Sequence, residues 1–183
     1  MGSHTCLYYE SEENLLELVS SFFEQGFRTN DLCLWVVPQS LGVEGAKLAL
    51  GKKIKDLHVY LKKNQFEFLS HDNVYLKSGI FNPDDVLALY LKKEEDVSRR
   101  GFSGLCLSGD ASWMQEGDWD KMAAYEKRVD KLISQRKIKA LCTYPAEKFN
   151  MSNMFSLSFS HDLIIRKKDG EVDILMDKRD LFK

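Results

Sequence analysis

The chain has 183 residues, of which 44% are hydrophobic and 30% are charged. This composition excludes a disordered chain, and the length favours a single α/β domain that spans residues 1–183. The 26 Lys and Arg residues are balanced by 28 Asp and Glu residues and are spread along the sequence, which argues against a nucleic-acid-binding protein.

The apolar runs of the sequence have the length of strands. None approaches the about 20 residues that a transmembrane helix needs, and the first residues lack the charged and apolar regions of a secretory signal. Four cysteines lie far apart within apolar runs, at Cys6, Cys33, Cys106 and Cys142, which is typical of buried thiols in a reducing compartment. We therefore expect a cytoplasmic protein without a membrane segment.

Strand and helix patterns alternate along the chain. The first half predicts a strand over His4–Tyr9, a helix from Ser11 to Gly26, a strand over Asp31–Val37, one helix over Gly42–Lys63 and a strand over Gln65–Ser70. The second half predicts a helix from Asn82, a strand over Phe102–Leu107, a helix over Asp118–Gln135, a strand over Ile138–Tyr144, a short helix over Glu147–Phe159 and strands over His161–Arg166 and Glu171–Leu175. Such alternation requires right-handed crossovers and predicts a mostly parallel sheet with helices on both faces, ending in a β-hairpin.

Ligands of such sheets bind outside the carboxyl ends of the strands. The residues expected at those ends are aromatic, acidic or small and polar: Tyr8, Tyr9, Glu10, Gln39, Ser40, His71, Asp72, Asp110, Ser112, Trp113, Thr143 and Tyr144. This set suits a small organic ligand better than a polyphosphate. Alternatively, the rings of Tyr8, Trp113 and Tyr144 only cap the core.

The sequence lacks the loop that a nucleotide-hydrolysing site needs, a glycine-rich turn ending in Lys and Ser or Thr. After the first strand it reads Tyr9-Glu10-Ser11-Glu12-Glu13, which would repel phosphate. Asp110 ends an apolar run as a metal-binding carboxylate of an ATPase would, but Asp is also common in turns.

Other catalytic patterns are not visible either. No Ser or Cys stands in a nucleophile elbow, and the four histidines lack a metal-binding spacing, so metal ligands would have to come from distant segments. We therefore expect a protein that is not an enzyme and that uses no cofactor and no metal.

A series of short motifs, in this order and spacing, resembles the MEDS family, the methanogen/methylotroph DcmR-type sensory domains. The motifs are His4-Thr5-Cys6-Leu7-Tyr8-Tyr9-Glu10, Gly26, Leu32-Cys33-Leu34-Trp35-Val36, Gly101-Phe102-Ser103-Gly104, Ser108-Gly109-Asp110-Ala111-Ser112-Trp113, Tyr125-Glu126, Leu141-Cys142-Thr143-Tyr144 and His161. The resemblance implies descent from RecA/KaiC-like ATPases, the sheet order 3-2-4-5-1-6-7 and a role in sensing hydrocarbon derivatives.

The leading hypothesis is a ligand-sensing module of a signalling system, which binds a small organic molecule such as a hydrocarbon or one-carbon derivative without turnover. Its candidate ligand-binding residues are Tyr8, Glu10, Asp110, Trp113 and Tyr144. A second group of candidates is His4, His161 and Glu126. In the implied sheet order the first and sixth strands are neighbours, so we expect the two imidazoles to meet at the edge opposite the ligand.

The output of such a sensor would pass to a partner, a kinase or regulator, because no kinase or DNA-binding region follows in the sequence. A homo-oligomer is also compatible with the sequence. The alternatives are a degenerate KaiC-like nucleotide-binding or ATPase-like protein, which would use Asp110 with Glu10 or Glu126, and a protein-docking domain.

Overall fold

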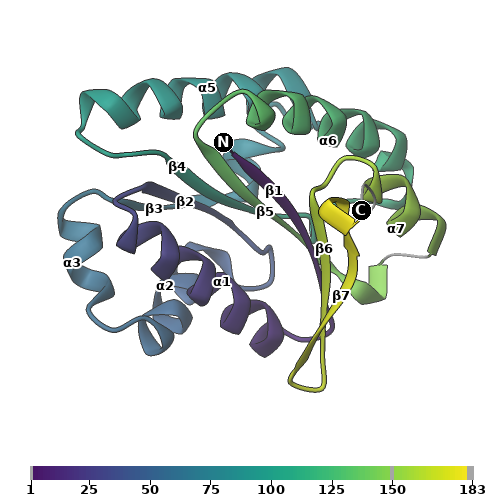
Figure 1. Ribbon diagram of the computed structural model, residues 1–183, viewed down its shortest axis with the longest axis horizontal. Helices are drawn as coiled ribbons and strands as arrows, with labels where there is room; N and C mark the ends of the chain where they lie inside the picture. The colour runs from purple at the N-terminus through teal and green to yellow at the C-terminus, as the bar shows by residue number, and fades with distance from the viewer. Residues whose placement is uncertain (1, 149–150, 181–183) are drawn as a thin grey trace.

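The computed structural model describes residues 2–148 and 151–180 and places a seven-stranded sheet between two layers of helices (Figure 1). The strands are β1 (Ser3–Tyr9), β2 (Leu32–Val37), β3 (Phe66–Ser70), β4 (Leu105–Asp110), β5 (Ile138–Pro145), β6 (Leu163–Lys168) and β7 (Glu171–Asp177). Their order is β3-β2-β4-β5-β1-β6-β7, and neighbours are parallel except for the antiparallel pair β6 and β7. The expected sheet order, the mostly parallel sheet and the C-terminal hairpin are confirmed.

The helices are α1 (Glu12–Arg28), α2 (Gly42–Lys53), α3 (Leu57–Lys62), α4 (His71–Val74), α5 (Pro83–Arg99), α6 (Trp119–Ser134) and α7 (Met151–Ser158). One face of the sheet, here the α1 face, is covered by α1, α2 and α3, and the opposite α6 face is covered by α5 and α6 (Figure 1). Within the described ranges, no helix combines the length and the apolar character needed to cross a membrane.

Each face of the sheet has its own hydrophobic core, because successive side chains of a strand point to opposite faces. The core of the α1 face includes Leu7, Tyr9, Phe23, Trp35 and Leu141. The core of the α6 face includes Cys6, Tyr8, Leu34, Tyr125 and Tyr144. All residues of β2 are buried, as expected for a central strand covered on both sides.

Local signals in the sequence explain where several elements begin and turn. The Ser11 hydroxyl accepts the Asn14 amide at 3.2 Å and caps α1, as expected for a serine that precedes two glutamates. Asp169 and Gly170 have φ values of 48° and 84°, the left-handed conformations that the tight turn between β6 and β7 requires.

Two helix predictions are wrong for local reasons. The first helix does not end at Gly26 but continues to Arg28. The glycine instead permits close packing, because a Cβ atom there would lie 2.9 Å from the sulfur atoms of both Cys33 and Cys106. The helix predicted over 42–63 is divided into α2 and α3, with Asp56 in a left-handed conformation at a φ of 60° before α3.

Two strands begin later than predicted. β4 runs from Leu105 to Asp110, and Phe102 stays outside it, with its ring centre 5.2 Å from the Arg100 guanidinium carbon. β6 begins at Leu163, so His161 precedes the strand. These shifts matter for the site, because they make Asp110 the last residue of β4 and leave His161 in a connecting segment.

Candidate functional site

A groove with a volume of about 410 Å³ lies at the carboxyl ends of β1, β2 and β5. Its lining includes Glu10, Glu12, Gln39, Ser40, Ser112 and Lys148. Both its volume and its position are typical of small-molecule sites in sheets of this type. We call it the edge groove.

The start of α1 gives the edge groove an acidic side. α1 begins here with Glu12 and Glu13 in its first turn, and the Ser11 hydroxyl already accepts the Asn14 amide. Phosphate-binding loops present free backbone amides and a lysine at this position. Carboxylates at the start of α1 stabilise the helix through its dipole and repel an anionic ligand.

Ser112 ties together the loops that form the edge groove. Its hydroxyl accepts the Gln39 amide at 3.1 Å, and its carbonyl accepts a hydrogen bond from the Lys148 ammonium group. Its own amide donates to Asp110 Oδ1 at 2.9 Å. The loops that follow β2, β4 and β5 are therefore held to one another.

Asp110, at the end of β4, holds two residues that line the edge groove, Tyr9 and Ser112. Its Oδ2 atom accepts the hydroxyls of Tyr9 at 2.9 Å and Thr143 at 2.8 Å, and the residue is 1% exposed. Burial raises the pKa of Asp110, although the hydrogen bonds from Ser112, Thr143 and Tyr9 oppose this shift. The carboxyl therefore joins β1, β4 and β5 and is covered from solvent.

The candidate ligand-binding residues lie on opposite faces of the sheet. Glu10 lines the edge groove, and Asp110 lies beside it on the α1 face. Tyr8 and Tyr144 point to the α6 face, with ring centres 5.8 Å apart, and both are buried. The alternation of side chains along β1 separates Tyr8 from Tyr9, which contacts Asp110.

The expectation that Trp113 lies at the rim is wrong. Its side chain is buried, because the chain turns inward after β4 and stacks the indole on Tyr75, with ring centres 5.1 Å apart. Phe81 packs against the same indole at 5.0 Å. Trp113 thus belongs to the core of the α6 face.

The sequence identified part of the edge groove. Gln39, Ser40 and Ser112 were expected at strand ends and do line it. Glu147 and Lys148 were missed because they stood in a predicted helix, whereas the structure has a short 3₁₀ turn over Ala146–Lys148. Glu147 and Lys148 are polar and closely follow β5, and this position at the carboxyl end of a strand could have identified them from the sequence.

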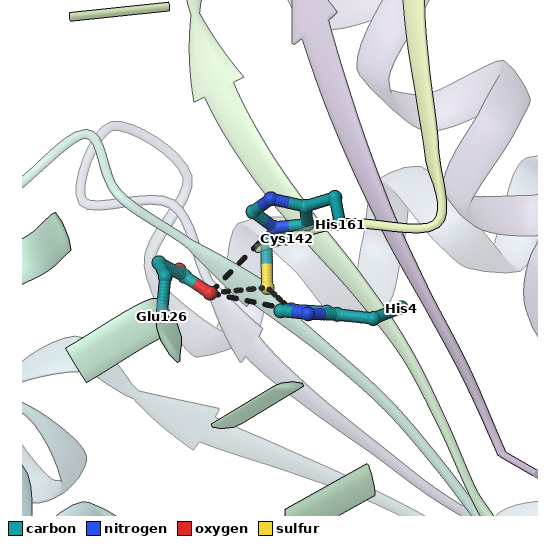
Figure 2. Close-up of side chains that lie close together, drawn as sticks. All are labelled: His4, Glu126, Cys142 and His161. Atoms are coloured by element: carbon teal, nitrogen blue, oxygen red, sulfur yellow. Dashed lines mark hydrogen bonds and ion pairs between the residues drawn. The ribbon is translucent and has the colours of Figure 1, made fainter. Parts of the chain in front are cut away.

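Four chemically active side chains meet inside the α6 face: His4, Glu126, Cys142 and His161, here the buried cluster (Figure 2). His4 Nε2 lies 3.2 Å from Glu126 Oε2 and 3.3 Å from Cys142 Sγ. The same Glu126 oxygen lies 3.7 Å from Cys142 Sγ and 3.6 Å from His161 Nε2. The four residues come from β1, α6, β5 and the segment before β6.

Hydrogen bonds outside the buried cluster orient its members. His4 Nδ1 lies 2.6 Å from the Ser160 carbonyl oxygen, and His161 Nδ1 lies 2.8 Å from that of Leu157. A carbonyl oxygen can only accept, so each Nδ1 carries a proton and each Nε2 faces the cluster. The Tyr144 hydroxyl donates to Glu126 Oε1, which leaves Oε2 directed inward.

Each titratable group of the buried cluster shifts the pKa values of its neighbours. Burial disfavours the charged form of His4, but Cys142, Asp130 and Glu126 outweigh this effect and raise its pKa well above the usual value. Burial would raise the pKa of Glu126, but His4, His161 and Tyr144 lower it. Burial, together with the charge on His4, lowers the pKa of His161 to about 4. Burial, together with the charge on Glu126, raises the pKa of Cys142 to about 11. Without a further ligand, the cluster holds a His4–Glu126 ion pair.

The expected contact between the two histidines is confirmed, with ring centres 4.0 Å apart. Both rings are completely buried. Glu126 contacts both rings and lies on the face opposite Asp110, so the structure does not bring these two carboxylates together. Of the two partners that the nucleotide-binding alternative named for Asp110, only Glu10 lies on the same side, at the edge groove. Cys142 was interpreted only as a buried thiol, although its position two residues before Tyr144 already placed it on the same face of β5.

Solved structures with the same fold are known from the hyperthermophilic archaeon Pyrococcus horikoshii. The KaiC-like protein PH0186 of strain OT3 is 12% identical in sequence and has a TM-score of 0.61. The match covers 96% of this chain and 79% of that chain. The uncharacterized protein PH0321, solved in complex with an unknown peptide, is 10% identical in sequence and has a TM-score of 0.65. The match covers 97% of this chain and 85% of that chain. The TM-scores show a shared KaiC-like fold, and at identities this low the likeness shows the fold alone.

No curated protein sequence matches the chain. The family model described as the methanogen/methylotroph DcmR sensory domain matches residues 3–162, from the start of β1 to the residue before β6. Both the edge groove and the buried cluster lie within this range. The chain belongs to the MEDS family of sensory domains.

Proposed function

We propose that this chain is the ligand-sensing module of a signalling system and binds a small organic molecule in the edge groove without turnover. The groove itself carries the proposal, since about 410 Å³ of space lies at the carboxyl edge of the sheet, where ligands of this fold class bind. Membership in a family of sensory domains supports the same role.

The lining of the edge groove favours an uncharged or cationic ligand. The groove lining holds three carboxylates, Glu10, Glu12 and Glu147, and one ammonium group, Lys148, which already donates to the Ser112 carbonyl. A second ammonium group, Lys168, lies outside the lining at 3.8 Å from Glu10, so the carboxylates still outnumber the cations. Such a balance gives a negative potential, which disfavours anions. Apolar surface from Leu15 and the two prolines of the lining would contact a short hydrocarbon part. A hydrocarbon or one-carbon derivative with a hydroxyl or amino group has this chemistry.

The same lining supports binding without catalysis. The described residues around the edge groove include no histidine or cysteine, and Asp110 beside it is occupied by three donors. Nucleophilic catalysis needs a hydroxyl or thiol hydrogen-bonded to a base. The groove contains serine hydroxyls and carboxylates, but among the described residues the Ser11 and Ser112 hydroxyls contact backbone amides and not a carboxylate. We propose instead that a ligand shifts the loops tied at Ser112, and that a partner kinase or regulator reads their position.

Calorimetric titration of the full chain tests this function. The panel contains short alcohols, amines and carboxylates, with ATP and magnesium measured beside it. We expect binding of one alcohol or amine class, at least about tenfold weaker in Glu10→Gln. The matched control is Glu24→Gln, which removes a partly exposed glutamate at the other end of α1.

Other results would identify the alternatives. Micromolar ATP affinity that is lost in Asp110→Ala would favour a degenerate nucleotide-binding protein. Because PH0321 was solved with a peptide, a peptide library is added to the panel. Binding of peptides with no response to small molecules would favour a docking domain.

A further inference from the structure

We propose that the buried cluster of His4, Glu126, Cys142 and His161 binds one divalent metal ion of the zinc type in a tetrahedral site. This site lies on the α6 face and is independent of the edge groove, so either proposal can fail without the other. Figure 2 shows the four side chains converging on one point from four separate segments.

The spacing of the buried cluster fits a metal. One ligand atom from each residue lies within 4.8 Å of the other three, and four of the separations are 3.2, 3.3, 3.6 and 3.7 Å. Zinc bonds of about 2.0–2.3 Å in a tetrahedron put neighbouring ligand atoms roughly 3.3–3.8 Å apart. A zinc ion would therefore need only small side-chain adjustments.

One atom of the cluster points to a ligand directly. His161 Nε2 is buried and has no hydrogen-bond partner within the part of the chain that the structure describes. Its Nδ1 proton is committed to Leu157, so Nε2 presents a lone pair to the centre of the cluster. Buried polar atoms of this kind are rare, and a coordinated metal would satisfy this one.

The surroundings match those of known metal ligands. Ligating histidines almost always donate their second ring nitrogen to a carbonyl or carboxylate, and ligating carboxylates are themselves hydrogen-bonded. Here Ser160 and Leu157 accept from the histidines, and Tyr144 donates to Glu126. These contacts fix the orientation of three of the four ligands before any metal arrives.

The charge also balances. A thiolate from Cys142 and a carboxylate from Glu126 carry two negative charges, and the imidazoles are neutral ligands. One divalent cation makes the site neutral, which a fully buried position requires. Sulfur together with nitrogen in a tetrahedral arrangement selects zinc or its probe cobalt over magnesium or calcium.

The competing explanation is a metal-free ion pair between His4 and Glu126. It accounts for their 3.2 Å contact, and the Cys142 thiol then has contacts of 3.3 Å with His4 Nε2 and 3.7 Å with Glu126 Oε2. It leaves His161 Nε2 without a hydrogen-bond partner among the described residues. A bound metal would instead link β1, α6, β5 and the segment before β6. The two explanations differ in whether Cys142 is a thiolate ligand.

Cobalt(II) chloride is the probe for this difference. The full chain is unfolded in urea with a phosphine reductant, refolded with cobalt so that burial does not block access, and freed of excess metal. We expect one cobalt per chain, tetrahedral d–d absorption and a sulfur-to-cobalt charge-transfer band. Zinc should displace cobalt and raise the melting temperature.

Matched variants locate the site. Cys142→Ser should lose the charge-transfer band, whereas Cys6→Ser, at the register partner of Cys142 on β1, should keep it. Tyr144→Phe should weaken metal affinity about 10–100-fold, as loss of a supporting hydrogen bond does. If Cys142→Ser does not fold, His161→Gln provides the same comparison through loss of the tetrahedral spectrum.

Two outcomes would overturn the metal site. One is a folded native chain that retains no stoichiometric cobalt after refolding. The other is bound cobalt without a charge-transfer band, or with a band that persists in Cys142→Ser.

Discussion

Replacing Asp110 tests how Tyr9 and Ser112, two residues that line the edge groove, are held. In Asp110→Ala the buried Tyr9 hydroxyl loses its acceptor, while Thr143 keeps a contact of 3.3 Å with the Gly109 carbonyl and Ser112 loses an amide partner. The buried Tyr9 hydroxyl would be left without an acceptor, and the hydrogen bonds to the carboxylate would be lost. Together these losses should lower the free energy of unfolding by about 2–4 kcal/mol. Asp110→Asn keeps an acceptor at this position and should cost about 1 kcal/mol or less.

The pH dependence of the same pair gives a second readout. Burial raises the pKa of Asp110, so this carboxyl stabilises the fold below its unfolded pKa, and the contribution is lost as pH rises through the folded value. Asparagine does not titrate. The free energy of unfolding of the native chain relative to Asp110→Asn should therefore fall as pH rises from about 4.

Urea unfolding followed by circular dichroism, at several pH values between about 4 and 7, measures both effects. Equal losses for Asp110→Ala and Asp110→Asn would contradict the prediction, because an acceptor retained at this position would then preserve no stability. A relative stability that is flat or rises with pH would show that the carboxyl is not raised in pKa by burial.

Further predictions concern packing and ligand selectivity. Gly26→Ala should lower the free energy of unfolding by about 1–3 kcal/mol, because its methyl group would press on Cys33 and Cys106. Gly51→Ala, in α2 with open space around the position, should raise it by about 0.5–1 kcal/mol in the same urea assay. ATP with magnesium should leave the melting temperature unchanged, since Glu12 stands where a phosphate would bind; a concentration-dependent rise would contradict this.

The local sequence pattern predicted which segments form strands and helices, but not which strands pair in the sheet. Apolar runs and caps such as Ser11 indicated most strands and helix starts, but no periodicity specifies which strands pair. The sheet order was available only from the resemblance to a family. Where prediction failed, a backbone detail decided the outcome, as with the left-handed Asp56 that precedes α3.

The two sites differ in how far the sequence could define them. Strand ends are visible in the sequence, so Glu10 and Ser112 could be placed at the edge groove. The buried cluster depends on registers between distant strands, and a slip of one residue would turn Cys142 to the other face. Trp113 was misplaced for a related reason, since its direction depends on the turn after β4.

We propose that a small organic ligand occupies the edge groove. The most direct test is an amide chemical-shift titration of the ¹⁵N-labelled chain with the member of the alcohol and amine panel that binds most tightly. If the ligand binds in the edge groove, saturable shifts are expected to concentrate at the amides of Glu10, Glu12, Gln39, Ser112 and Lys148. Shifts confined to the α6 face or to the β6–β7 hairpin, with these groove amides unchanged, would contradict it.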